Sequence, residues 1–189
     1  MAESDTDETL MLRYQAGDGA AFDKLYARHR GALYRFIQRQ CRAQDAAAEL
    51  FQDVWMNLIQ AKDRYRVEAQ FRTYLFTLAH NRVMDFFRSH ARTAAQHIDG
   101  DCDDDIVNNI PASRTAEPEV RALSREQGAA LLKLLDALPD AQREAFLLHE
   151  EGGLNVEEIA AAMGITFEAA KSRLRYAVAK LRDGLREFA

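Results

Sequence analysis

The stretch from Asn155 to Arg182 constrains the fold more than any other part of the chain. Asn155 followed three residues later by Glu158 is a capping-box pattern, which predicts the start of a short helix. Gly164 is expected to end that helix, because glycine readily adopts the left-handed conformation that a tight turn needs. Thr166 is placed to cap a second helix that runs almost to the C-terminus. A short helix, a glycine turn and a longer helix are the layout of a helix-turn-helix.

The predicted second helix is amphipathic and basic. Its apolar residues recur at helical spacing and are expected to face inward: Ala170, Leu174, Ala177, Val178 and Leu181. Up to Arg182, five basic residues lie outside that stripe and only Glu168 opposes them, a balance of +4: Lys171, Arg173, Arg175, Lys180 and Arg182. The second helix of a DNA-binding helix-turn-helix enters the major groove, so this helix is a candidate reading helix. An amphipathic hairpin with a solvated basic face remains the alternative.

Charge and composition limit the classes of function. The net charge of −5 argues against indiscriminate coating of nucleic acid, but local positive charge still permits DNA binding. No apolar run reaches about 18 residues, and the acidic N-terminus lacks the order of a signal peptide, so we expect a cytoplasmic protein with no membrane contact of its own. Cys41 and Cys102 are far apart, which fits a reducing compartment. His97 and Cys102 alone would make a poor metal site, so we expect no metal and no cofactor.

The remaining chain predicts an all-α fold with two small helical domains. Apolar residues repeat at helical spacing over 8–16, 20–41, 45–61, 71–92, 119–138 and 141–150, and no stretch alternates as a strand would. Five aspartates between Asp99 and Asp105, followed by Pro111 and Pro118, indicate an extended acidic linker. The expected organisation is a disordered N-terminus (1–7), a helical bundle (8–92), the linker (93–118) and a helix-turn-helix domain (119–189).

Two pairs of motifs resemble a known family. The first is residues 71–88 (FRTYLFTLAHNRVMDFFR) preceded by 48–55 (AELFQDVW), and the second is residues 155–165 with 171–174 (KSRL). They are similar to region 2 and region 4 of the sigma-70 family, in its small extracytoplasmic-function (ECF) subfamily. The chain departs from the family pattern at Tyr74, where tryptophan is usual, and at Ala170, where a β-branched residue is usual.

The resemblance implies a non-enzymatic promoter-specificity subunit with three kinds of partner. These are core RNA polymerase (the clamp of the largest subunit and the flap of the second largest), promoter DNA, and an anti-sigma factor. It also implies that the acidic linker threads the polymerase channels, although a passive, solvated linker remains possible.

The resemblance also assigns site residues for DNA. The minus-35 duplex would be read from the second helix, where a basic side chain can contact base edges or only phosphate: Thr166, Phe167, Lys171, Ser172, Arg173 and Arg175. The melted minus-10 strand would be held by aromatic stacking and basic side chains, with residues 62–70 as a specificity loop that takes a flipped base. These candidates are Lys62, Arg64, Tyr65, Arg66, Arg72, Tyr74, Asn81, Arg82 and Arg88. From Lys62 to Arg92, seven basic residues face three acids, a balance of +4.

The polymerase clamp would be gripped by the helix over 45–61. The candidates are Leu50, Gln52, Asp53, Trp55 and Asn57, with Trp55 open to either a core or an interface role.

Two other hypotheses compete with the one that the family resemblance implies. A ligand-responsive helix-turn-helix regulator leaves the basic and aromatic mixture of Lys62 to Arg92 unexplained, and an all-helical enzyme with a DNA-binding tail lacks any catalytic constellation.

Overall fold

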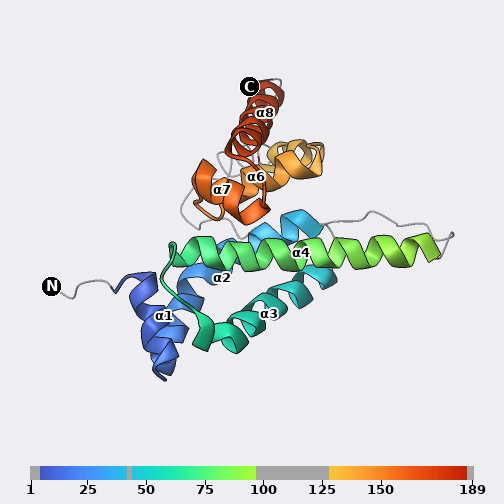
Figure 1. Cartoon of the computed structure of the whole chain (residues 1–189). Coiled ribbons are helices and arrows are strands. Elements are labelled where there is room, and N and C mark those ends of the chain that lie inside the picture. The colour runs from blue at the N-terminus through green and yellow to red at the C-terminus, as the bar shows by residue number, and fades with distance from the viewer. Residues whose placement is uncertain (1–4, 42–43, 97–127, 187–189) are drawn as a thin grey trace, which may run out of the picture.

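The computed structural model of the chain describes residues 5–41, 44–96 and 128–186, and over these residues it is helical without strands, which confirms the predicted all-α fold. The elements, labelled in Figure 1, are α1 (Asp7–Gln15), α2 (Gly19–Cys41), α3 (Gln44–Ala61), a 3-10 turn η1 (Lys62–Arg64), α4 (Phe71–Gln96), α6 (Asp140–Glu150), α7 (Val156–Met163) and α8 (Phe167–Arg186). Residues 128–136 are also helical. Of the linker predicted over 93–118, residues 93–96 are instead the last residues of α4, and the rest, with His97 and Cys102, lies outside the described residues.

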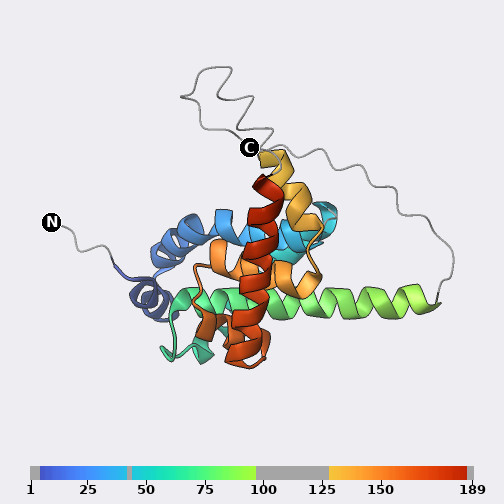
Figure 2. The ribbon, with the colours of Figure 1, turned by 90° about the horizontal axis from the view of Figure 1, so that it is seen from above.

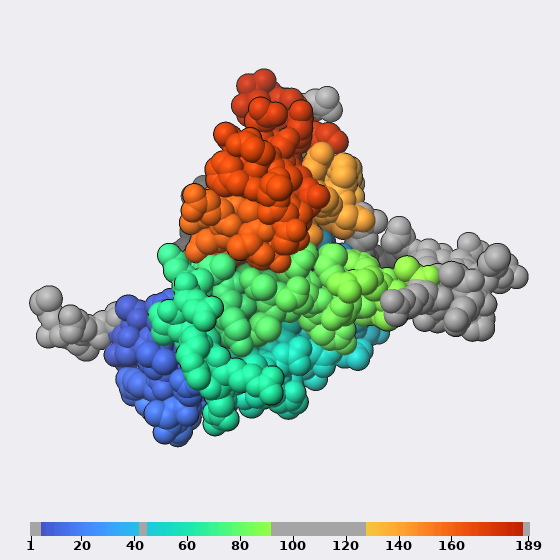
Figure 3. Space-filling model, viewed as in Figure 1, coloured from blue at the N-terminus to red at the C-terminus, as the bar shows by residue number. Residues whose placement is uncertain are grey.

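Helix α4 lies at the centre of the molecule. In Figure 1, α1 and α3 lie below α4, α2 passes behind it, and α6, α7 and α8 lie above it. Seen from above in Figure 2, α8 runs across α4 rather than along it. The space-filling view in Figure 3 shows the C-terminal helices standing directly on α4. The two groups of helices are therefore in contact and not held apart.

One hydrophobic core joins the two groups of helices. Phe36 of α2 and Phe76 of α4 are fully buried with their rings edge to face at 5.5 Å between centroids. Leu148 and Ile159 from the C-terminal helices belong to the same buried cluster. A smaller cluster holds α8 to the helical segment 128–136 through Leu135, Leu138, Ala177 and Leu181.

The helix-turn-helix forms for the local reasons that the sequence predicted. The Asn155 side chain accepts a hydrogen bond from the Glu158 backbone N–H, and the Glu158 carboxylate accepts one from the Asn155 N–H, so the capping box is complete. Gly164 has φ +63°, the left-handed conformation expected of it. The Thr166 hydroxyl accepts a hydrogen bond from the Ala169 N–H at 3.3 Å, at the start of α8.

Some local details differ from the predictions. Val178 was assigned to the buried stripe of α8, but it is 44% exposed and lines a surface groove. At the start of α6, Pro139 occupies the N-cap position and Asp140 pairs with Arg143 at 2.8 Å. Helix α1 begins at Asp7, one residue before the predicted helix over 8–16, with Thr6 as its N-cap.

None of the helices in the described part of the chain is both long enough and apolar enough to cross a membrane.

Candidate nucleic-acid interface

The start of α8 presents the residues predicted to read duplex DNA. Phe167 is 43% exposed, and the Lys171 ammonium lies 5.8 Å from the centre of its ring. Lys171 and Arg175 are exposed, and the Arg175 guanidinium lies 5.1 Å from the Tyr176 ring. Ser172 and Arg173 are half-buried, so their side chains reach solvent from the flank of the helix. The first three turns of α8 thus carry basic and aromatic groups on an accessible face.

Ala170, where the family usually has a larger residue, is fully buried beneath that face. Its small side chain packs within the main hydrophobic core, together with the partly buried Leu174. The start of α8 is therefore anchored by the same core that holds α4.

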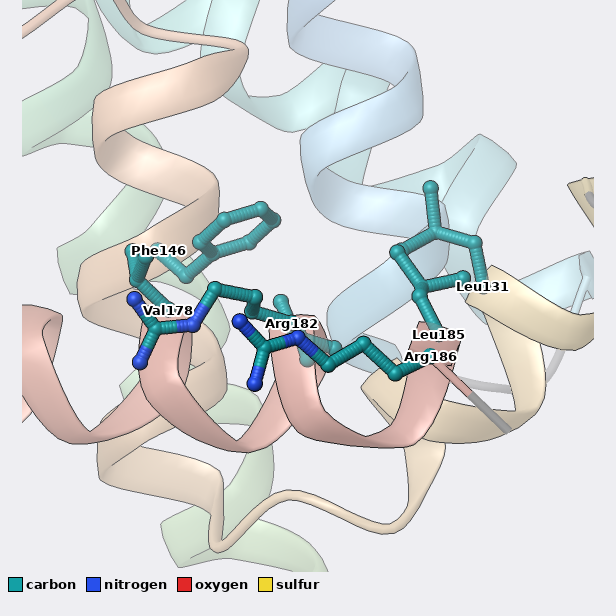
Figure 4. A pocket seen from close by; sticks show the side chains of 7 residues that line it. Leu131, Phe146, Val178, Arg182, Leu185 and Arg186 are labelled. Atoms are coloured by element: carbon teal, nitrogen blue, oxygen red, sulfur yellow. The ribbon is translucent and has the colours of Figure 1, made fainter. Parts of the chain in front are cut away.

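An apolar groove lies farther along α8. It has a volume of about 410 Å³ and is lined by Leu131, Phe146, Val178, Leu181, Arg182, Leu185 and Arg186. Figure 4 shows Phe146 at one end, Leu131 and Leu185 at the other, and the two arginine side chains between them in this view. The exposure of Val178 follows from its place on this groove.

The loop between α3 and α4 is held in place by side chains of α1. The Gln15 amide donates hydrogen bonds to the backbone carbonyls of Lys62 and Asp63, both at 3.0 Å. The Lys62 ammonium lies 5.2 Å from the centre of the Tyr14 ring. The Arg66 guanidinium donates to the Asp63 and Tyr65 carbonyls at 3.1 and 2.8 Å. The predicted specificity loop is therefore preorganised, with Arg64 exposed on it.

Glu8 of α1 caps the start of α4. Its carboxylate accepts a hydrogen bond from the Phe71 backbone N–H at 2.8 Å. That hydrogen bond is the main reason why the pKa of Glu8 lies below its usual value of 4.5. A negative charge at a helix N-terminus also interacts favourably with the helix dipole.

A hollow of about 600 Å³ opens beside the loop. It is lined by Asp7, Glu8, Val67, Glu68, Ala69, Gln70 and Arg72. Its size is within the range of about 300–1,000 Å³ typical of small-molecule sites. The hollow combines acidic walls from α1 with one guanidinium from the first turn of α4. Asp7 is charged at neutral pH: burial alone would raise its pKa, but the hydrogen bond from Arg28 and the adjacent His29 lower it overall.

Tyr65 is the predicted strand-binding residue that the structure places differently. It is only 3% exposed, and its ring lies edge-on to Tyr74 at 5.2 Å and to Phe71 at 6.3 Å. Burial raises the pKa of Tyr65 to about 12, and among the described residues its hydroxyl has no hydrogen-bond partner. Tyr65 therefore cannot stack on a base in this conformation, whereas the half-buried Tyr74 beside it presents part of its ring.

The other minus-10 candidates lie along α4. Asn81 and Arg88 are exposed, and the Arg88 guanidinium lies 3.4 Å from the Asp85 carboxylate. Arg82 instead binds Asp53 of α3, with a guanidinium-to-carboxylate distance of 2.6 Å. This ion pair joins a predicted DNA-binding residue to a predicted polymerase-binding residue.

Leu50 and Trp55, both predicted to bind polymerase, are buried in the core of this chain. Leu50 is 1% exposed and Trp55 is 4% exposed, with the indole packed on Phe22 and Tyr26. Of the two roles considered for Trp55, core or interface, this structure shows the core role. Gln52 and Asn57 are exposed on the other side of α3 and Asp53 is half-buried, so these three can reach a partner.

Comparison with known proteins identifies the family. The sigma factor CarQ of Myxococcus xanthus is 32% identical over 178 residues, which cover 94% of this chain and 97% of that protein. Residues 25–93 match sigma-70 region 2, and residues 128–181 match sigma-70 region 4. The chain belongs to the ECF subfamily of the sigma-70 family.

Other relatives agree with that identification. The ECF sigma-E factor of Escherichia coli K12 is 27% identical over 175 residues, covering 92% of this sigma factor and 91% of the relative. The fold also resembles the sigma factor RpoE of Bartonella quintana, with a TM-score of 0.71 at 24% identity, covering 87% and 96% of the two chains. The resemblance to CnrH has a TM-score of 0.67 at 23% identity, covering 98% and 100%. The resemblance read from the sequence is therefore confirmed, and the protein is an RNA polymerase sigma factor.

Met56 is a residue of this sigma factor that sequence reasoning missed. It is 50% exposed on α3, beside the polar residues predicted to bind polymerase. Its place one residue after the buried Trp55 could have indicated this, because it puts Met56 outside the apolar stripe. Exposed methionines adapt well to partner surfaces, which makes Met56 a further candidate for polymerase contact.

Proposed function

We propose that this sigma factor reads one promoter at two places with two different surfaces. The α8 surface, within residues 119–189, reads the minus-35 element as duplex. The α4 surface and its specificity loop, within residues 8–92, capture the melted minus-10 strand. The observation that carries this proposal is the presence of two accessible basic surfaces on separate helical units, each with exposed aromatic or polar groups.

At the minus-35 element, Arg173 and Lys171 take different roles. Arg173, half-buried at the flank of α8, is held in a narrower range of positions and is suited to a bidentate contact with a guanine edge. Lys171 is exposed near Phe167 and is suited to a phosphate. Thr166, Ser172 and Arg175 flank them, at the backbone or at neighbouring bases.

At the minus-10 element, the specificity loop takes a flipped base into the hollow beside it. The hydrogen bonds from Gln15 and Arg66 fix the loop before DNA arrives, which reduces the entropy cost of binding. Arg64, Arg72 and Arg88 supply positive charge for the strand, and Asn81 and Tyr74 contact its bases. Tyr65 supports the loop from beneath by packing on Tyr74.

The protein partners follow from the family and from the comparison structures. Gln52, Asp53, Met56 and Asn57 on α3 bind the clamp of the largest polymerase subunit, and the C-terminal unit binds the flap of the second largest. The polymerase carries out the chemistry and the sigma factor only directs it. The two comparison structures are complexes, of CnrH with the cytosolic domain of CnrY and of RpoE with the anti-sigma factor NepR, which supports an anti-sigma partner for this chain.

Substitution of Arg173 tests the minus-35 assignment. Arg173→Ala should weaken binding to the cognate promoter by about tenfold or more, since a bidentate base contact contributes roughly 1–3 kcal/mol, and should relax the preference at one base pair. Lys180→Ala removes one exposed charge from the same helix and is the matched control, with a small and sequence-independent effect. An Arg173→Ala holoenzyme that protects the minus-35 bases as fully as wild type would refute the assignment.

A further inference from the structure

An ion pair joins helix α3 to helix α4 at the edge of the proposed strand-binding surface. The Arg82 Nε donates a hydrogen bond to Oδ2 of the Asp53 carboxylate at 2.8 Å, and Arg82 Nη2 lies 2.6 Å from the same oxygen. The family resemblance assigned Asp53 to polymerase binding and Arg82 to the melted strand. One contact within this chain therefore occupies a residue from each of the two predicted sites.

Core packing fixes the backbone on both sides of this ion pair. Asp53 precedes the buried Val54 on α3, and Arg82 precedes the buried Val83 on α4. Both valines belong to the main hydrophobic core, in which α3 and α4 pack together. Because the two backbones are held there, Asp53 and Arg82 can change partners by rotating their side chains alone.

The ion pair is accessible to other binding partners. The Asp53 side chain is 37% exposed and the Arg82 side chain is 28% exposed. An ion pair at this exposure stabilises a fold only slightly, because water already solvates both charges. Both contacts from Arg82 end on Oδ2, so in the described part of the chain the other oxygen of Asp53 remains open to a second donor. A partner that brings its own cation can therefore bind Asp53 without disturbing the core.

Arg82 follows the exposed Asn81, which is assigned to the strand. Successive residues of a helix are about 100° apart around its axis, so Arg82 leaves α4 between the side of Asn81 and the side of α3. While it binds Asp53, its guanidinium is turned towards α3 and its charge is neutralised. Once released, its long side chain can turn towards the strand and neutralise a phosphate instead.

We propose that Asp53 holds Arg82 away from the strand, and that a cation of the polymerase on Asp53 releases Arg82 to bind a phosphate of the melted strand. A carboxylate has a single negative charge, so a second cation beside it weakens its hold on the first. The inference rests on the proposed function, because it needs polymerase on α3 and the strand on α4. Polymerase and strand then strengthen each other's binding, since each uses one partner of the same ion pair.

The first test measures single-strand binding by the full chain without polymerase. The probe is a fluorescein-labelled strand from the minus-10 region of a promoter mapped for this sigma factor, and fluorescence anisotropy gives its affinity. Asp53→Asn should raise the affinity by about fivefold, because it releases Arg82. The logarithmic salt dependence should become steeper by about 0.7, the value for one more phosphate contact on a single strand.

Two further variants control for a general effect of charge. Glu49 lies one turn before Asp53 on the same face of α3, is exposed, and forms no ion pair within the described residues. Glu49→Gln should therefore leave the salt dependence unchanged and raise the affinity only slightly. Adding Arg82→Gln to Asp53→Asn should remove the gain in both affinity and salt dependence.

The second test repeats the measurement with saturating core polymerase. Polymerase already occupies Asp53 in the holoenzyme, so Asp53→Asn should give no further gain. Arg82→Gln should now weaken strand binding by about fivefold, whereas it should change binding by the free chain much less. Circular dichroism and urea unfolding establish that each variant stays folded.

The results separate the proposal from its alternatives. A gain confined to the free Asp53→Asn chain, together with a loss confined to the Arg82→Gln holoenzyme, supports it. Equal gains from Asp53→Asn and Glu49→Gln would overturn it, because the effect would then be general electrostatics. An equal loss from Arg82→Gln with and without polymerase would also overturn it, because Arg82 would then bind the strand at all times. If the wild-type holoenzyme does not bind the minus-10 strand more tightly than its complement, the proposed function itself fails and the inference fails with it.

Discussion

Substitution of Gly152 by alanine should destabilise the protein by about 2 kcal/mol. An added Cβ would lie 2.5 Å from the Leu148 carbonyl oxygen, 2.9 Å from the Leu154 side chain and 3.2 Å from the Phe76 ring. The carbonyl belongs to the backbone of α6 and cannot rotate away, so the end of α6 must shift. Overpacking of this kind costs roughly 1–3 kcal/mol. For a chain of this size, about 2 kcal/mol corresponds to a decrease in Tm of roughly 4–8 °C.

The matched control is Gly19→Ala at the first residue of α2. Nothing lies within 4 Å of a Cβ there and its φ is not positive, so this change should be neutral or stabilise by about 0.4–1 kcal/mol. Urea unfolding followed by circular dichroism measures both variants. If Gly152→Ala unfolds at the same urea concentration as wild type, the close approach of α6, Leu154 and α4 does not exist in solution.

Three further predictions concern single groups. Asn155→Ala should cost about 1 kcal/mol in urea unfolding, because the Glu158 N–H loses its acceptor, while Asn155→Asp should retain most of the stability. Glu8→Gln should be less stable than wild type at neutral pH. The pKa of Glu8 in the folded protein lies below the unfolded value of 4.5. The stability difference between wild type and Glu8→Gln should therefore have its full size above pH 4.5 and shrink as the pH falls through the folded pKa. In a Cys102→Ser variant, Cys41 should resist thiol reagents at pH 8 until the protein unfolds, since burial raises its pKa to about 11 from 9.0.

Each of these three has a distinct contrary result. An equal loss of stability in Asn155→Ala and Asn155→Asp would mean that the cap hydrogen bond does not stabilise α7. A stability difference for Glu8→Gln that is constant from pH 7 to pH 3 would exclude a charged cap on α4. Rapid labelling of Cys41 in folded protein would show that α2 does not bury its end.

Local features of the helix-turn-helix were predictable because each depends on a few adjacent residues. Asn155, Glu158, Gly164 and Thr166 have the caps and turn that their order predicted. The error at Val178 has a physical cause. Periodicity places a residue on a helix face, but it does not say how much of that face a neighbouring helix covers.

The tertiary contacts of the site could not be predicted in the same way. Glu151 and Arg35 are 116 positions apart, and in the sequence each is an ordinary charged residue. Tyr65 was expected on the DNA surface because the family resemblance places residues 62–70 in a specificity loop with basic and aromatic side chains. Its burial depends on the packing of the loop against Phe71 and Tyr74, which no local pattern encodes.

Run-off transcription with core polymerase on two forms of one promoter tests the two-surface account most directly. One template is fully paired and the other is already unpaired across the minus-10 element. The account predicts that Asn81→Ala and Arg173→Ala both reduce transcription from the paired template. The unpaired template should largely restore transcription by the Asn81→Ala variant, because the proposed role of Asn81 is to capture the opened strand. It should not restore transcription by the Arg173→Ala variant. Equal rescue of both variants, or of neither, would contradict the division of promoter reading between α4 and α8.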